Sequence, residues 1–193
     1  KQTTVFPGDF GYSKGSAHMS VSHRSSDNKL NASFSTIYVA DKNNLLNNDF
    51  TSLAITLAPN APALYDTQGN LNWENSTWTN PLAALENKYK ANSNNLLSNA
   101  VVSYKILKGL EIKSSMGFNT VQFRDRNMFP SKATNPAFGL TPAISRLQIN
   151  TQEVKSWIAE PQLLYSRTIS KGKLSSIIGT TFQEQISEQT VQV

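Results

Sequence analysis

Apolar and polar residues alternate with a period of two in several separate parts of the chain. The alternation is clear in Ser16–Arg24, "SAHMSVSHR", and again in Lys29–Ala40, "KLNASFSTIYVA". Successive side chains of a β-strand point to opposite faces, so each stretch predicts a strand with one apolar face. The stretch between them, "SSDN", is rich in residues that favour tight turns. The two stretches therefore predict a β-hairpin.

The same hairpin unit recurs twice further along the chain. Asn99–Thr120 holds the cleanest alternation, with "KG" as its turn, and Val154–Gln185 repeats it around a turn at Ser170–Lys173. Pro161 lies inside the last unit, and because proline lacks a backbone N–H we expect it to mark an edge or a bulge. Three hairpins in sequence predict an all-β fold, an antiparallel meander of about six strands.

The connections between the hairpins are much longer than the turns that close them. Asp41 to about Asn94 and Arg124 to about Thr151 each far exceed the usual connection of roughly 4–6 residues. Transmembrane β-barrels have short periplasmic turns, long extracellular loops and strands of about 9–11 residues. Small barrels need about 8 strands and plugged transporters about 22. We therefore expect part of the wall of a large transmembrane β-barrel, with two long extracellular loops.

On this interpretation the two faces of the strands have different surroundings. We expect the following residues to face lipid: Leu30, Phe34, Tyr38, Tyr104, Ile112, Phe118, Trp157, Leu163 and Tyr165. We expect these to face the lumen: Ser33, Ser103, Lys105, Glu111, Lys113, Glu160 and Gln162. The alternative is a complete soluble all-β domain whose apolar faces form a two-sheet core. Periodicity alone leaves both open.

The first long connection contains two of the three tryptophans, Trp73 and Trp78, in "LNWENSTWTNPLA". They either pack the loop onto its own scaffold or, with Tyr65, contact a ligand or a partner, as aromatic residues do at binding surfaces. In the soluble alternative these three residues bind carbohydrate. The following segment Asn80–Lys90 predicts a short helix, with Pro81 in its first turn.

Composition limits the chemistry of the 193 residues. The net charge is +5, but Lys and Arg are scattered, so we expect no nucleic acid as a partner. The absence of cysteine excludes disulfides, thiolate metal sites and a cysteine nucleophile. His18 and His23 fall on opposite faces of one predicted strand, and no carboxylates pair by spacing. We therefore predict no enzyme, no catalytic residue, no cofactor and no metal site.

Several stretches together resemble one known family. They are "TVFPGDFGYSKGSAHMSVSHRS", "KLNASFSTIYVADKNNL", "LAPNAPALYDTQGNLNWENSTWTNPLA", "NLLSNAVVSYKILKGLEIKSSMGFN" and "SWIAEPQLLYSRTISKGKLSSIIGTTFQ". In that order they are similar to the first part of the barrel of the SusC/RagA family of TonB-dependent outer-membrane transporters of Bacteroidetes. The loop containing Trp73 and Trp78 is the most specific piece.

The resemblance implies a nutrient importer that takes up glycans or peptides together with a SusD-like surface lipoprotein. It places Thr4–Gly11 in an outer loop and the three hairpin turns in the periplasm. It implies TonB as a partner through regions outside these residues and contact with outer-membrane lipid, and it allows a dimer of transporter–lipoprotein pairs. Residues 1–193 would then be a partial receptor barrel domain, without the plug domain and the remaining strands.

Overall fold

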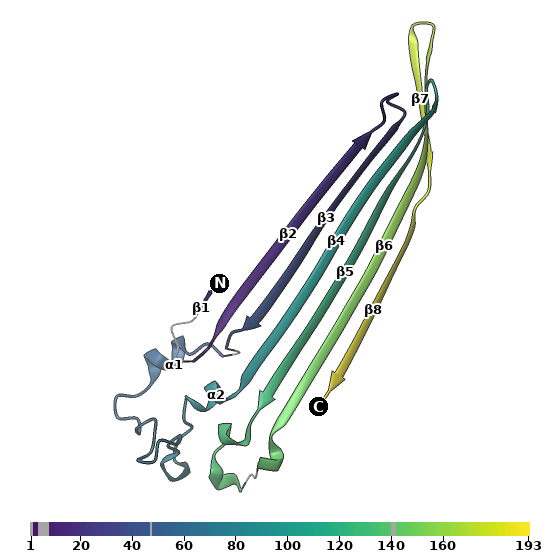
Figure 1. Cartoon of the computed structure of the whole chain (residues 1–193). Helices are drawn as coiled ribbons and strands as arrows, with labels where there is room; N and C mark the ends of the chain where they lie inside the picture. Colours follow the sequence, from purple (N-terminus) through teal and green to yellow (C-terminus); the bar gives the residue numbers. More distant parts are fainter. Residues whose placement is uncertain (1, 4–7, 47, 140–141) are drawn as a thin grey trace.

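The structure, a computed structural model, describes residues 2–3, 8–46, 48–139 and 142–193 (Figure 1). These residues form one antiparallel sheet with the strand order β1-β2-β3-β4-β5-β6-β7, and β8 also pairs with β6. The strands are β1 (Gln2–Thr3), β2 (Gly11–Arg24), β3 (Leu30–Asn44), β4 (Lys88–Leu107), β5 (Leu110–Phe129), β6 (Arg146–Ile169), β7 (Gly172–Gly179) and β8 (Phe182–Gln192). The predicted all-β meander is confirmed.

Strands β7 and β8 act as one strand with a break, so the sheet has six long strands and the short β1. Both pair with β6, β7 along its end near the turn and β8 along the rest. The break at Thr180 and Thr181 lies beside Pro161, whose carbonyl accepts a hydrogen bond from the Thr180 N–H at 3.1 Å. In an antiparallel sheet the N–H and C=O groups of one residue point toward the same neighbouring strand. Because proline lacks an N–H, Pro161 accepts a hydrogen bond from the strand formed by β7 and β8 but donates none to it. The edge or bulge predicted at Pro161 is wrong for β6, which pairs on both sides and keeps its register with β5 through Pro161; the irregularity lies in the partner strand.

The strands are longer than the sequence pattern predicted. β4 and β5 have 20 residues each and β6 has 24, where about 9–11 were expected. The long loops are correspondingly shorter, 45–87 and 130–145, where the sequence predicted Asp41–Asn94 and Arg124–Thr151. Near the loops both faces of the strands carry many polar side chains, so no apolar alternation marks these ends as strand.

The loops contain only short helices. They are α1 (Thr51–Thr56), η1 (Glu74–Ser76), α2 (Ala83–Glu86), η2 (Ser131–Ala133), η3 (Pro136–Phe138) and η4 (Pro142–Ile144). The helix predicted over Asn80–Lys90 is wrong in extent, because α2 has 4 residues and β4 begins at Lys88. Of the outer-loop stretch Thr4–Gly11, residues 4–7 lie outside the described residues and Gly11 opens β2. No helix of the described chain is long and apolar enough to cross a membrane.

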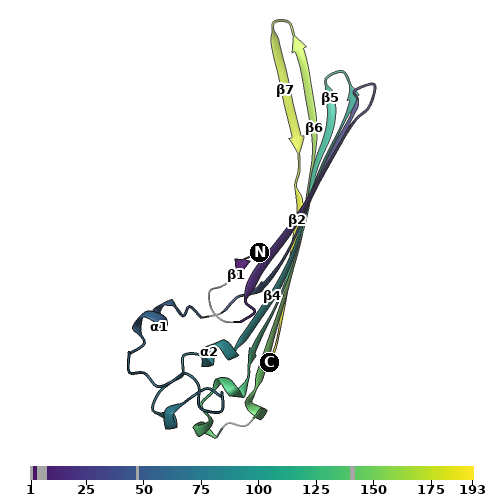
Figure 2. The same cartoon turned by 60° about the vertical axis from the view of Figure 1, so that its left-hand side comes forward.

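The short turns gather at one end of the sheet and the long loops at the other (Figures 1 and 2). All three predicted turns are present between consecutive strands. Gly109 closes the turn between β4 and β5 with a φ of +86°, and a side chain there would collide with the Ser166 carbonyl of β6. Only glycine meets both conditions at this position.

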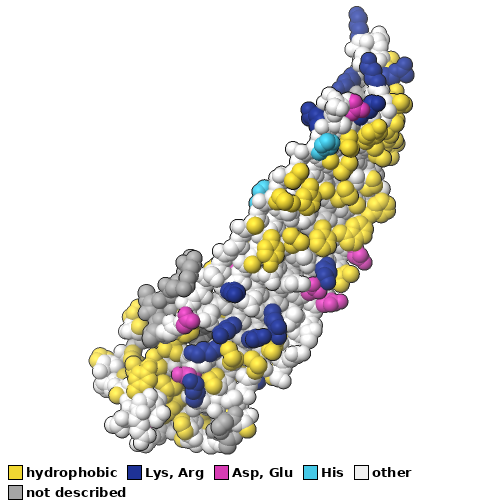
Figure 3. All heavy atoms as spheres, viewed as in Figure 1, with side chains coloured by type: hydrophobic (Ala, Val, Ile, Leu, Met, Phe, Trp, Pro, Cys, Tyr) yellow, Lys and Arg dark blue, Asp and Glu magenta, His cyan; other side chains and the backbone are white. Residues whose placement is uncertain are grey.

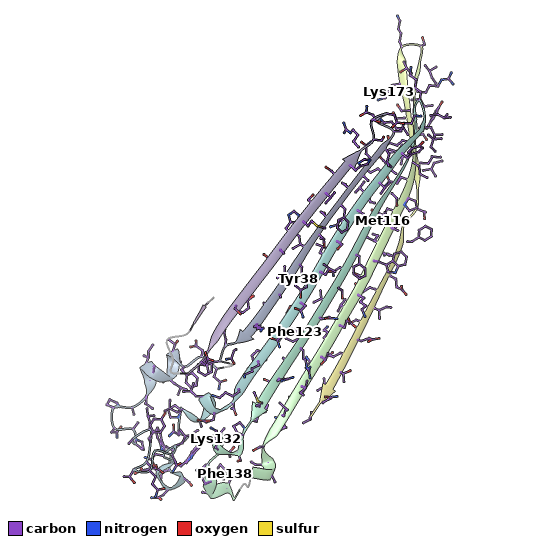
Figure 4. All side chains as sticks on the ribbon, in the orientation of Figure 1. Tyr38, Met116, Phe123, Lys132, Phe138 and Lys173 are labelled. Carbon is purple, nitrogen blue, oxygen red and sulfur yellow. The ribbon has the colours of Figure 1, made fainter. Side chains whose placement is uncertain are left out.

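The cross-strand register separates the side chains into the two predicted faces. Phe34, Ala100, Met116, Ala159 and Phe182 form one continuous row across the sheet, and Ser33, Val101, Ser115 and Glu160 form a row on the other side. The first side is called the apolar face, and its large side chains form a band that is visible in Figure 3. Tyr38 and Met116, labelled in Figure 4, belong to it. His18 and His23 lie on opposite faces, as predicted.

Nothing within the described residues covers the apolar face. The exposed large hydrophobic residues of this band include Met19, Val21, Phe34, Tyr38, Tyr104, Ile112, Met116, Phe118, Trp157, Leu163, Tyr165, Ile178 and Phe182. Among described residues the only buried hydrophobic ones are Phe10, Phe50, Ala83 and Ala91. The two-sheet core that the soluble alternative predicted is therefore wrong, because these residues form a single sheet without a second layer.

The few buried residues lie where the loops meet the sheet. Ala91 and Asp125 are cross-strand partners on the face opposite the apolar one, and both are buried. Lys90 and Arg126, the next residues along on the apolar face, are exposed. The loops thus fold over the opposite face and leave the apolar face open. Figure 2 shows them projecting to one side of the sheet.

Candidate functional site

The first long loop contains a small hairpin-like turn that positions Tyr65. An isolated bridge pairs Tyr65 with Leu71, and the Asp66 carboxylate accepts hydrogen bonds from the backbone N–H groups of Gln68 at 2.9 Å and Asn70 at 2.8 Å. The hydrogen bond from the Asn70 backbone is the main reason that the pKa of Asp66 lies below its usual value. Gly69 has a φ of +82° within the turn. Tyr65 is held at its base while its ring is 54% exposed.

Asn80 ties the two halves of this loop together. Its side chain is 1% exposed, and its amide donates to the carbonyl oxygens of Leu64 at 2.6 Å and Asn72 at 2.9 Å. The oxygen of the same side-chain amide, Oδ1, accepts a hydrogen bond from the Leu82 N–H at 2.9 Å. A buried amide with three partners fixes the path of the chain on both sides of the tryptophans.

The two tryptophans of this loop have different surroundings. The Trp78 indole N–H donates to the Asn72 carbonyl at 3.1 Å, which holds the ring against the loop itself. Trp73 lies just before η1 and lines an open cleft together with Tyr65. The structure therefore brings Tyr65 and Trp73 to one surface and leaves Trp78 outside it.

The cleft separates the first long loop from the second. It has a volume of about 760 Å³, and besides the two aromatic residues its lining includes Asn70, Asn72, Asn75, Lys132 and Asn135. An ion pair between Lys132 of the second loop and Glu86 of α2 links the two sides. Figure 4 labels Lys132 between the loops. The two connections, far apart in the sequence, thus form one surface.

The chemistry of the cleft is that of binding. Two aromatic rings, several amides and one ion pair can stack on and hydrogen-bond to a polar ligand. No group of three or more His, Asp or Glu residues in the described chain is arranged to hold a metal ion.

Sequence reasoning missed Asn80 and the contribution of the second loop. Asn80 precedes Pro81, and an Asn-Pro pair is a known turn signal, but sequence does not show that its amide is buried. Asn135 also precedes a proline, is buried, and caps η3 by accepting a hydrogen bond from the Ala137 N–H at 3.0 Å. In both loops the same dipeptide marks a structural asparagine.

Comparison with known proteins gives a match in structure only. The sequence matches no protein-family model and no curated protein. The fold is similar to chains in structures of the RagAB peptide importer in its "open-open" state, with 15% identity, and in its "closed-closed" state, with 15% identity, and of the RagAB peptide transporter, with 14% identity. Each match has a TM-score of 0.64 and covers 93% of this chain.

The match covers only part of each similar structure. This chain spans 21% of the length of those chains. At this identity the likeness establishes the fold, a long antiparallel meander with loops at one end.

Proposed function

We propose that this chain is a wall segment of a TonB-dependent outer-membrane nutrient importer of the SusC/RagA type. The observation that carries this proposal is the apolar band on a single sheet that nothing within the described residues covers. Fully burying a large apolar side chain away from water is worth about 1.5–3 kcal/mol. Because the side chains of the band are partly exposed, a membrane that covers the band recovers part of this free energy for each of them.

The dimensions of the band fit a bilayer. Leu110 and Phe118 lie at the two ends of its dense part on β5, and an extended strand separates them by roughly 27 Å. Strands of outer-membrane barrels tilt by about 35–45°, so this length spans roughly 19–22 Å along the membrane normal, close to the apolar band of about 25 Å in such barrels. The part of each strand near the loops then extends beyond the hydrocarbon region, which accounts for its polar character.

The orientation follows from the two ends of the sheet. The short turns lie on the periplasmic side, and the loops 45–87 and 130–145 lie outside the cell. Strand edges do not persist in lipid without partners, so further strands of a longer polypeptide complete the barrel. The fold likeness to the RagAB peptide importer supports this arrangement.

The ligand contacts of this proposal lie in the cleft between the loops. Tyr65 and Trp73 contact a peptide or glycan, or the SusD-like lipoprotein that presents it, while Trp78 packs the loop. The parent protein works with TonB through segments outside residues 1–193. Substrate import is its function, and catalysis is not.

Site-directed spin labelling tests the membrane placement. The 193 residues contain no cysteine, so Met116→Cys on the apolar face and Ser115→Cys on the opposite face each add one labelling site to this segment. In the full-length transporter in liposomes, we expect the label at 116 to be accessible to oxygen and the label at 115 to a water-soluble nickel chelate. Equal nickel accessibility at both positions, or a soluble monomer without detergent, would contradict the proposal.

Substitution of the aromatic residues tests the cleft. Trp73→Ala should weaken ligand or lipoprotein binding about tenfold, because a stacking surface is lost. Phe138→Ala is the matched control, since Phe138 is an exposed aromatic residue of the second loop, labelled in Figure 4, that does not line the cleft. Equal binding by the Trp73 variant and the parent protein would show that Trp73 does not contact the ligand or the lipoprotein.

A further inference from the structure

Four cationic side chains lie on the apolar face between the apolar band and the loops. They are Lys42 on β3, Lys90 on β4, and Arg124 and Arg126 on β5, and are called here the cationic belt. All four are exposed. Figure 3 shows Lys and Arg side chains gathered on this face, directly beyond the hydrophobic band.

The register places the four cations close together. Lys90 and Arg126 are direct cross-strand partners, and Lys42 and Arg124 flank the same residue, Asn92, in the neighbouring row. Cβ atoms of direct cross-strand partners lie about 4.5–5.5 Å apart, and like charges in such pairs destabilise a sheet. The like charges therefore lower the stability of the sheet at this place, and an anion bound between the side chains would offset this cost.

The protein does not supply that anion within its described residues. The ion pairs of the described chain are Lys29–Asp27, Lys132–Glu86 and Lys155–Glu153, and none of them includes a belt residue. Glu153 is the carboxylate of this face closest to the belt in register, and it is occupied by Lys155 at 2.9 Å and by the Gln122 amide at 2.8 Å. Asp125 lies between Arg124 and Arg126 in sequence but is buried on the opposite face.

The belt borders an open depression on the same face. Its volume is about 940 Å³, and its lining includes Lys42, Arg124, Asn92, Asn94 and Gln122 together with two acidic residues, Asp41 and Glu153. Asn94 and Gln122 are direct cross-strand partners, as are Asn92 and Arg124. Amide and guanidinium donors therefore converge where the apolar band ends.

We propose that the cationic belt binds phosphorylated headgroups of lipids in the leaflet on the loop side of the membrane. This inference rests on the proposed function, because it requires the apolar band to lie in a bilayer. A lipid satisfies both parts of this surface, since its acyl chains cover the band while its phosphates meet the belt. A soluble polyanion such as nucleic acid would leave the adjoining apolar side chains uncovered.

Lipid retention by the full-length transporter tests this inference. The protein is reconstituted in nanodiscs of phosphatidylcholine, whose phosphate is balanced by choline so that the headgroup has no net charge. The nanodiscs also contain a small fraction of anionic bisphosphorylated lipid A or of its phosphate-free analogue, and bound lipid is measured by native mass spectrometry. We expect the parent protein to retain the phosphorylated lipid roughly tenfold more than the analogue. The variant K42Q/K90Q/R124Q/R126Q should lose most of that preference.

The matched control removes four cations near the opposite end of the strands. The variant K29Q/K108Q/K171Q/K173Q changes the net charge equally at the turns and should keep the lipid preference. Figure 4 labels Lys173 at this end. Loss of preference in both variants would indicate a general charge effect and would overturn the inference.

The outcomes separate the two proposals. If the parent protein inserts into the nanodiscs but retains both lipids equally, the lipid site is overturned and the proposed role as a transporter wall segment is not affected. A parent protein that does not insert at all contradicts the proposed function, and the lipid site with it. Displacement of the bound lipid by millimolar inorganic phosphate would show that the belt recognises the phosphate group itself and would support the inference.

Discussion

The loop cluster and the apolar band are built in opposite ways. The loops are fixed by polar contacts within the chain, with Asn80 buried and bonded to the Leu64 and Asn72 carbonyls. The band has large apolar side chains such as Phe118 and Trp157, which are 42% and 43% exposed. The loop cluster makes its stabilising contacts within the described chain, whereas the apolar band is left uncovered by it. The difference fits the proposed function, in which the loops contact ligands and the band contacts lipid.

The largest effect should come from placing a charge in the band. Val102→Arg should destabilise the membrane-inserted barrel by about 2–4 kcal/mol, because Val102 pairs with Ser114, midway between Leu110 and Phe118 on β5, so arginine would face hydrocarbon near the middle of the bilayer. Its sequence neighbour Val101→Arg, on the opposite face, should have a much smaller effect. Urea unfolding of the full-length protein in liposomes measures both, and equal losses would show that the two faces have the same surroundings.

A loss of about 2–3 kcal/mol in local stability is expected for Asn80→Ala. The substitution removes three hydrogen bonds, two to the Leu64 and Asn72 carbonyls and one from the Leu82 N–H, each worth about 0.5–1.5 kcal/mol. Hydrogen exchange of residues 64–82 should rise while exchange in the strands stays the same. Gln68→Ala, at an exposed position of the same loop, is the control. Unchanged exchange in the Asn80 variant would show that the loop is fixed by other contacts.

Gly109→Ala tests the turn end and should cost about 1–2 kcal/mol. Alanine is strained at a φ of +86°, and its methyl group would meet the Ser166 carbonyl. Gly15→Ala is the matched control, because Gly15 lies in β2 with open space around its Cα. Thermal unfolding of the two variants compares them, and equal stability would argue against a strict glycine requirement.

The ion pair that links the two loops should contribute less than about 1 kcal/mol to the stability of the loop cluster. The Lys132–Glu86 pair is largely solvent-exposed on the Lys132 side, and exposed ion pairs are weak. A double-mutant cycle with Lys132→Gln and Glu86→Gln, read from protease sensitivity of residues 130–145, measures the coupling. It should decrease in high salt, and a salt-independent coupling would point to packing.

The smallest effect should come from acidification of the turn at Asp66. Its folded-state pKa is lowered, so its stabilising contribution is present above the unfolded value of about 3.9 and is lost as the pH falls through the folded value. Tyrosine fluorescence or hydrogen exchange at residues 65–71 should show opening only below about pH 4. Asp66→Asn should remove this pH dependence, whereas persistence of the transition would assign it to another group.

Much of the fold was predictable because alternation is a local property. Phe34, Tyr104 and Ile112 fall on the predicted face because every second residue of a strand shares a face, whatever its neighbours are. The strand ends at Asn44 and Lys88 were missed because both faces are polar there. The helix over Asn80–Lys90 was overextended because pairing of β4 with β5 from Lys88 onward outweighs local helix propensity.

The sequence by itself determined the hairpins, their turns, the two faces and the aromatic residues of the first loop. Only the tertiary structure decided that Tyr65 and Trp73 share a cleft with Lys132 while Trp78 packs the loop. It also decided that Lys42, Lys90, Arg124 and Arg126 form one belt. The physical reason is the separation in sequence of the residues involved, since alternation and turn chemistry depend only on residues that are near neighbours in the chain. The cleft and the belt arise from pairing between strands that are distant in sequence.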